Sequence, residues 1–250
     1  PNPEVAGNGC VLLLRAGVAC EQLPTPEVDL FYREYAHWVK KQRPWVTAKI
    51  AVTADGFIAA AGGAPLAITG NEAQQYTHLR RKHSSALMTS VQTIITDNPA
   101  FNVRLGGECI KKPLLVLDRR GRMPADSQVL KSTGPVFRLH AKGLDNDILS
   151  ALSGVTHVAV ATDASGLSLP AVFDGVGQLG FHHLWLEVGA HLLPALLRHN
   201  LVDELVVYVA QKTVVLEQGL RLPNLLPASG KFAPVDSMQL GDDWVGIWLL

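Results

Sequence analysis

The residues best suited to chemistry stand at the end of an apolar run in the last third of the chain. Residues 182–186 read as a buried strand, Glu187 stands at its carboxyl end, and Gly189 precedes a helix-like run. In α/β sheets, a strand, turn and helix in this order form ligand crevices, and the free N–H groups of a helix start bind phosphate. An ordinary crossover connection has the same pattern, so this stretch alone leaves both interpretations open.

Three cationic side chains upstream could meet such a ligand. Lys49 lies in an alternating strand pattern and faces either the interior, where an ammonium needs a partner, or solvent together with Thr47. Arg81 ends a predicted helix and Arg104 follows a turn at Asp97, so two separate elements could clamp one phosphate. The helix dipole alone also favours cations at a helix end, and Asp in such a turn commonly caps the backbone.

Two further patterns look functional but do not fit their context. Residues 175–180 spell Gly-x-Gly-x-x-Gly, yet the run precedes a predicted strand and opens no helix, unlike a dinucleotide-binding loop. Asp203 and Glu204 form an adjacent carboxylate pair, but neighbours on a strand point to opposite faces, so we expect them to end a helix. The sequence contains neither a Walker loop nor a Gly-x-Ser-x-Gly elbow.

The elements that must position these residues are strands and helices in alternation. The patterns predict strands over residues 45–53, 86–89, 114–117, 136–139, 157–161, 184–186, 204–209 and 244–249. They predict helices over 10–16, 27–41, 144–152 and 192–199, and another that a Thr69-x-x-Glu72 capping box opens and that runs to about residue 82. Doubly buried strands that alternate with helices indicate the α/β class, with a largely parallel sheet.

Composition narrows the functional class. The chain has 250 residues, 48% of them apolar, which suffices for one large α/β domain or two small ones. Basic and acidic residues number 22 each, a balance that argues against a nucleic-acid partner. No apolar run is long enough to cross a bilayer. The three cysteines fit a reducing, cytoplasmic compartment, and neither they nor the nine histidines have metal-ligand spacing.

Several short motifs occur in an order that is typical of one enzyme family. They are Pro-Trp-Val-Thr-Ala-Lys at 44–49, Asp-Gly at 55–56, Ile-Thr-Gly at 68–70, Leu-Arg-Arg at 79–81, Asp-Asn-Pro at 97–99, Asn-Val-Arg at 102–104, Leu-Glu-Val-Gly at 186–189 and Leu-Val-Asp-Glu-Leu at 201–205. Together they resemble the reductase domain of the bifunctional riboflavin-biosynthesis deaminase–reductase of the RibD type. Residues 1–20 are similar to the end of its deaminase domain. We therefore expect a deaminase tail and linker over 1–43 and the reductase domain over 44–250.

The resemblance implies a dihydrofolate-reductase-like α/β fold, with a mostly parallel sheet, helices on both faces, and assembly as a homodimer. It implies the NADPH-dependent reduction of 5-amino-6-(5-phosphoribosylamino)uracil, a pyrimidine ribosyl phosphate, to its ribitylamino form in riboflavin biosynthesis. It assigns Arg81, Arg104 and Glu187 to substrate binding, and Lys49 and Asp97 to catalysis near the ribose. The cofactor contacts that it implies are Ala51, Thr93, Asp97, Gly189 and Ala190.

Departures from the family pattern leave other functions open. The family's Ser-x-Trp before Ile-Thr is Pro65-Leu66-Ala67 here, so a hydroxyl and an aromatic ring are missing. The zinc motifs of the deaminase do not occur in these residues, which excludes zinc deamination by them. The alternative function is a catalytically impaired reductase-like protein, kept as a binding or structural subunit. A third candidate function is that of a reductase that acts on another small heterocycle.

Overall fold

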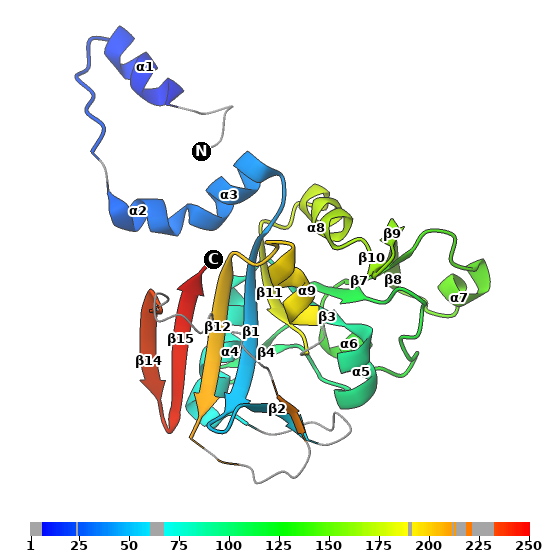
Figure 1. Cartoon of the computed structure of the whole chain (residues 1–250). Coiled ribbons are helices and arrows are strands. Elements are labelled where there is room, and N and C mark those ends of the chain that lie inside the picture. The colour runs from blue at the N-terminus through cyan, green and yellow to red at the C-terminus, as the bar shows by residue number, and fades with distance from the viewer. Residues whose placement is uncertain are drawn as a thin grey trace.

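A nine-stranded sheet forms the centre of the protein (Figure 1). The computed structural model describes residues 7–23, 25–60, 68–189, 192–211, 213, 219–221 and 233–250. Across the sheet, the strands are β14 (Asp236–Leu240), β15 (Asp243–Leu249), β12 (Glu204–Ala210), β1 (Trp45–Thr53), β11 (His183–Glu187), β3 (Ala86–Ser90), β6 (Leu114–Leu117), β7 (Val136–Ala141) and β8 (Val155–Val160). The strands from β12 to β8 are parallel, and β15 and β14 are antiparallel at one edge.

Three two-stranded antiparallel sheets accompany the large one. They pair β2 (Phe57–Ala60) with β13 (Gly219–Arg221), β4 (Val103–Leu105) with β5 (Glu108–Ile110), and β9 (Thr162–Asp163) with β10 (Gly166–Leu167). The β4–β5 hairpin turns at Gly106 and Gly107, whose φ angles are 58° and 82°. A two-residue turn with both φ angles positive favours glycine, because a side chain is strained there. This tight hairpin carries Arg104.

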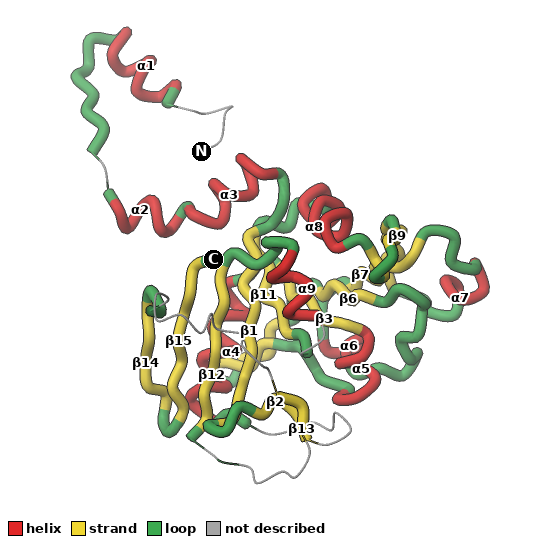
Figure 2. Tube along the Cα trace, in the orientation of Figure 1, coloured by secondary structure: helices red, strands yellow, loops and turns green. Residues whose placement is uncertain are grey.

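Helices cover both faces of the large sheet (Figure 2). In chain order they are α1 (Asn8–Arg15), α2 (Pro26–Phe31), α3 (Arg33–Lys41), α4 (Asn71–His83), α5 (Val91–Asp97), α6 (Val129–Ser132), α7 (Asn146–Ser150), α8 (Leu169–Gln178) and α9 (Leu192–Arg198). The apolar residues of α8 and α9 pack in the core on one face, and those of α4, α5 and α6 pack on the other. This arrangement confirms the predicted α/β class with a mostly parallel sheet.

The N-terminal helices differ in how they meet the sheet. α1 has no buried residue and lies apart from the sheet (Figure 1). α3 instead packs against β1 and β11, and its Trp38 Nε1 donates to the carbonyl of Gly177 in α8 at 3.1 Å. A Cβ on Gly177 would lie 2.1 Å from the Gln42 carbonyl oxygen, so only glycine permits this approach. The domain boundary at residue 43 stays a prediction.

Each predicted strand overlaps an observed one, but the helices needed corrections. The predicted helix over 27–41 is divided at Tyr32 into α2 and α3. Thr69 does not cap the next helix, because α4 begins after Gly70, whose N–H donates to Asp243 Oδ2 at 2.6 Å. Three helices, α5, α6 and α8, were not predicted. No helix in the described part of the chain has the length and apolar character needed to cross a membrane.

Candidate active site

A cavity of about 1090 Å³ opens at the carboxyl ends of the parallel strands, and we call it the crevice. β1 contributes Lys49 and Ala51 to its wall, and β11 contributes Glu187. The connections after strands add Gly189 and the start of α5. A crevice at this edge is where open α/β sheets bind ligands, because the connections between strands and helices meet there. Topology therefore brings together residues that are far apart in the sequence.

Lys49 faces the interior of the protein. Thr47, Lys49 and Ala51 lie on one face of β1, and Thr47 is fully buried, so the alternative in which Lys49 faces solvent with Thr47 is wrong. The reason is that α4 covers this face of the sheet. The Lys49 Nζ lies 5.1 Å from the centre of the Tyr208 ring. Burial lowers the pKa of Lys49, Glu187 acts in the opposite direction, and Arg81 lowers it further.

Glu187 is the most strongly bound carboxylate in the crevice. Its Oε1 accepts hydrogen bonds from Arg81 Nε at 2.6 Å and from Trp185 Nε1 at 2.8 Å. Lys49 is its register neighbour on β1. Burial by itself raises the pKa of Glu187, but the charges of Arg81 and Lys49 and the two hydrogen bonds outweigh burial and lower the pKa to about 2. Glu187 is therefore an anion near neutral pH.

Arg81 and Arg104 meet at Asn102. Arg81 Nη1 donates to the Asn102 carbonyl at 3.0 Å, and Arg104 Nη1 donates to Asn102 Oδ1 at 3.0 Å. The Arg81 guanidinium also lies 5.1 Å from the centre of the Phe101 ring, and both residues line the crevice. Arg104 is exposed and lies outside the crevice wall, with its backbone N–H bonded to His78 Nδ1 at 3.2 Å. The two arginines thus share a neighbour but differ in access to the cavity.

The residues expected on the cofactor side also line the crevice. Ala51, Thr93, Asp97 and Gly189 are part of its wall, whereas Ala190 lies outside the described residues. Asp97 is the last residue of α5, not a turn residue, and burial raises its pKa. The altered residues 65–67 also lie outside the described part of the chain. Among the described residues, no three His, Cys, Asp or Glu side chains are grouped as metal ligands would be.

The loop after β6 adds three cations that sequence reasoning missed. Arg119, Arg120 and Arg122 all line the crevice. The fully buried Asp118 holds this loop, since its carboxylate accepts the backbone N–H groups of Arg122 at 2.8 Å and Met123 at 3.0 Å. A signal was present in the sequence, because the arginines directly follow the carboxyl end of a doubly buried strand.

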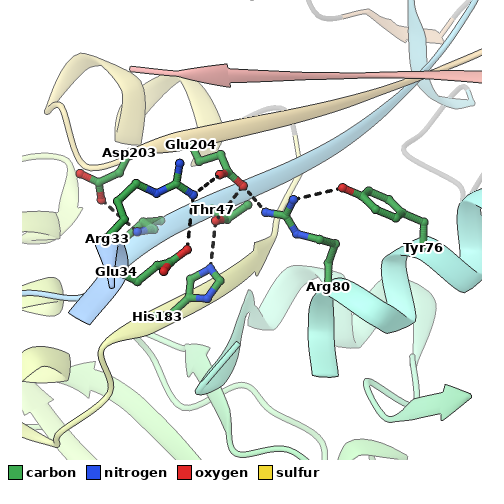
Figure 3. Close-up of polar contacts among 9 residues, drawn as sticks. Arg33, Glu34, Thr47, Tyr76, Arg80, His183, Asp203 and Glu204 are labelled. Atoms are coloured by element: carbon green, nitrogen blue, oxygen red, sulfur yellow. Dashed lines mark hydrogen bonds and ion pairs between the residues drawn. The ribbon is translucent and has the colours of Figure 1, made fainter. Parts of the chain in front are cut away.

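A second group of charges lies at the opposite ends of the same strands (Figure 3). This amino-end cluster consists of Arg33, Arg43, Thr47, Arg80, His183, Asp203 and Glu204. Glu204 pairs with Arg80, accepts from Arg33 at 3.0 Å, and accepts from the Thr47 hydroxyl at 3.3 Å. Asp203 accepts from Arg43 at 2.8 Å and from the Val46 N–H at 2.9 Å.

The expectation that Asp203 and Glu204 end a helix was wrong. α9 ends at Arg198, and Glu204 is the first residue of β12. Both carboxylates are buried, so each needs cationic or N–H partners. Those partners come from α3, β1, α4 and the connection before β1, none of which is near in sequence. Local pattern therefore could not reveal their role.

Comparisons with known proteins identify the family of this chain. The model of the RibD C-terminal domain family matches residues 44–245. A riboflavin biosynthesis protein RibD from Actinobacillus pleuropneumoniae is 31% identical over 220 residues, which cover 86% of this chain and 58% of that protein. RibD from Haemophilus influenzae is 28% identical over 97% of this chain and 68% of that protein.

The fold comparison gives the same result. The solved structure of Acinetobacter baumannii RibD superposes with a TM-score of 0.81 at 26% identity, over 100% of this chain and 70% of that one. The present chain thus spans 58% to 70% of these relatives. Its architecture is dihydrofolate-reductase-like, and the family model matches most of its length. The chain belongs to the RibD C-terminal domain family.

Proposed function

We propose that this chain catalyses the NADPH-dependent reduction of 5-amino-6-(5-phosphoribosylamino)uracil to its ribitylamino form in riboflavin biosynthesis. The observation that carries the proposal is the charge of the crevice wall. Among the described residues of that wall, Lys49, Arg81 and the three arginines after β6 face only two acidic residues, an excess of three positive charges. Such an excess favours ligands that carry several phosphate groups, as NADPH and a ribosyl phosphate together do.

The substrate is proposed to bind beside Arg81 and Glu187. Arg81 presents a planar cation that can donate two hydrogen bonds to a phosphate, and Phe101 below it provides an apolar surface. Glu187, held as an anion, can accept hydrogen bonds from the hydroxyl groups of a sugar. Arg104 shares Asn102 with Arg81, and we assign it to the outer side of the phosphate.

NADPH is proposed to occupy the part of the crevice lined by Ala51, Thr93, Asp97 and Gly189. The family resemblance adds Ala190 to these contacts. A volume of about 1090 Å³ is at the upper end of the range for small-molecule sites, which suits a dinucleotide and a second ligand. The three arginines after β6 provide the cations that a 2′-phosphate requires. We assign these arginines to that phosphate, which distinguishes NADPH from NADH.

The proposed reaction requires that the cofactor and the sugar carbon be aligned and that a proton reach the sugar oxygen. NADPH supplies a hydride to the sugar carbon when it is bound. The sugar oxygen that leaves this carbon gains a proton, and Lys49 and Asp97 are the candidate donors. Burial lowers the pKa of Lys49 and raises that of Asp97, so each pKa shifts in the direction that favours proton donation. Arg81 and Glu187 hold the substrate so that the hydride and the proton act on adjacent atoms.

The deciding experiment measures binding and turnover separately. Calorimetry should show NADPH binding in roughly the micromolar range, and NADPH absorbance should fall when the deaminated ribosylaminouracil phosphate is added. Absence of NADPH binding would contradict the reductase proposal. Binding without turnover would favour the alternative, a catalytically impaired protein kept as a binding or structural subunit.

The assignment of the 2′-phosphate has its own test. An Arg119→Gln/Arg120→Gln double variant should weaken NADPH about tenfold or more and leave NADH nearly unaffected, because charged hydrogen bonds contribute about 1.5–3 kcal/mol each. Arg15→Gln, on the exposed helix α1, is the matched control. Equal weakening of both cofactors would refute the assignment.

We further propose a homodimer, which the family resemblance implies, and a cytoplasmic location. Cys10, Cys20 and Cys109 are all free thiols, which supports a reducing compartment. Sedimentation equilibrium of the purified chain tests the dimer, and a mass equal to one chain at micromolar concentration would contradict it.

A further inference from the structure

Trp185 donates a hydrogen bond to Glu187, the carboxylate that we propose binds the substrate. It is fully buried on β11, and its indole Nε1 donates to Glu187 Oε1 at 2.8 Å. Residues two apart on a strand share a face, so the backbone aims both side chains the same way. Arg81 Nε binds the same oxygen at 2.6 Å. Among the described residues no donor binds Oε2, and that oxygen remains to accept from a ligand.

The Trp185 indole also contacts Arg80 of the amino-end cluster. The Arg80 guanidinium lies 5.4 Å from the centre of the Trp185 ring, within the range of a cation–π contact. Glu204 pairs with Arg80, and Tyr76 Oη accepts from Arg80 at 3.2 Å (Figure 3). Register explains this proximity, because Thr47 of β1 is the lateral neighbour of both Trp185 and Glu204. The amino-end cluster and the crevice thus meet at one buried ring.

We propose that Trp185 is a positioning residue for the reductase: its indole N–H fixes the orientation of the Glu187 carboxylate so that Oε2 faces the substrate. This inference rests on the proposed function. A carboxylate between two cations, Arg81 and Lys49, can rotate to favour either one. The indole supplies one rigid, neutral donor whose direction the sheet sets, and this selects a single rotamer of Glu187.

The competing role for Trp185 is that of a large core residue. Trp185→Phe separates the two roles, because phenylalanine keeps an aromatic ring on the strand but has no N–H. Trp248 provides the matched control, since it is 3% exposed and packs on the other face of the sheet. Trp248→Phe should lower the stability of the protein and leave the Michaelis constant for substrate unchanged.

The first test needs no turnover. Indole ¹H–¹⁵N resonances are recorded for the full chain, and that of Trp185 is identified by its loss in Trp185→Phe. In Glu187→Gln the Trp185 proton should shift upfield, because its acceptor loses its charge. The Trp248 resonance should stay in place. A Trp185 resonance that does not move in Glu187→Gln would overturn the proposal.

The second test is kinetic. Trp185→Phe should raise the Michaelis constant for the ribosylaminouracil phosphate about tenfold, the size of one hydrogen bond to a charged group, and leave that for NADPH unchanged. Glu187→Gln should raise it as well, and Trp185→Phe should have little further effect in that background. Additive effects would overturn the proposal. If the unmodified chain has no reductase activity, the proposed function fails, while the resonance test still decides the contact.

Discussion

The crevice and the amino-end cluster use the same residue types on the same three strands, yet they differ in how their charges are satisfied. β1, β11 and β12 carry the cluster at their first residues, whereas β1 and β11 carry Lys49 and Glu187 further along. In the cluster, Glu204 has three cationic or hydroxyl partners from three elements. In the described part of the crevice wall, two carboxylates face five cations across a cavity.

This difference separates structural charge from functional charge. Three arginines of the cluster meet Asp203 and Glu204, and Glu34 beside the cluster pairs with Arg33. Among the described residues, these cations and carboxylates are therefore equal in number without any ligand. Buried pairs of this kind cost desolvation and are retained only when every partner is present. The crevice keeps an excess of positive charge in an open cavity, which a bound anion can reduce. Substitutions in the two regions should therefore have different signatures.

The largest effect is expected from Glu204→Gln. It leaves Arg33 and Arg80 partly buried without their carboxylate, and we expect a loss of about 3–5 kcal/mol in the free energy of unfolding. Urea unfolding measures the loss. Glu34→Gln, which removes a more exposed partner of Arg33, is the control and should cost less than about 1 kcal/mol. Similar losses for both would show that the cluster is not a cooperative unit.

The corresponding change in the crevice is Arg81→Gln. It removes the cation that binds Glu187 and the proposed phosphate, so kcat/KM should fall about a hundredfold, equivalent to about 2.7 kcal/mol. Initial rates at varied substrate concentration provide the value. A lower free energy of unfolding with an unaltered kcat/KM would place Arg81 with the structural charges and remove the distinction between the two regions.

Acid should weaken the amino-end cluster before it affects the crevice. Burial, aided by Arg80, lowers the pKa of His183 from 6.5 to about 3, so the folded protein keeps it neutral while the unfolded chain takes up a proton below pH 6.5. Its stabilising contribution is complete above pH 6.5 and is lost as the pH falls towards 3. Glu187, with a pKa of about 2 in place of 4.5, adds a loss only below pH 4.5.

His183→Gln isolates that contribution. Between pH 6.5 and 4.5, the unfolding free energy of the unmodified chain should fall by about 1.4 kcal/mol per pH unit more than that of the variant. Urea unfolding at several pH values provides the slopes. Equal slopes would mean that His183 is protonated in the folded protein.

The smallest effect is expected at Arg104. Arg104→Ala should raise the Michaelis constant for the ribosylaminouracil phosphate about tenfold, or about 1.4 kcal/mol, because Arg104 is exposed, lies outside the crevice wall and bonds to Asn102 beside Arg81. The free energy of unfolding should change little. An unaltered Michaelis constant would return Arg104 to the ordinary surface of the β4–β5 hairpin.

How far the sequence predicts this protein differs between elements. Eight of the nine strands of the large sheet were predictable, since strands such as β1 and β6 are marked by patterns of apolar residues that only a buried sheet explains. β14 and the strands of the three small sheets were not predicted. α8 was missed because its interior contains Gly175 and Gly177, residues that weaken a helix unless packing requires them. Gly177 is required by the approach of the Gln42 backbone, a contact between distant parts of the chain.

The sequence by itself determined the α/β class, the position of Glu187 and Gly189 at a strand end, and the order of motifs that marks the family. These features are local or ordered along the chain, so burial patterns and motif spacing carry them. Only the tertiary structure decided that Lys49 faces inward, that three arginines after β6 join the crevice, and that Asp203 and Glu204 bind cations at the other end. The physical reason is that burial and charge compensation depend on neighbours that the parallel sheet brings together from distant segments.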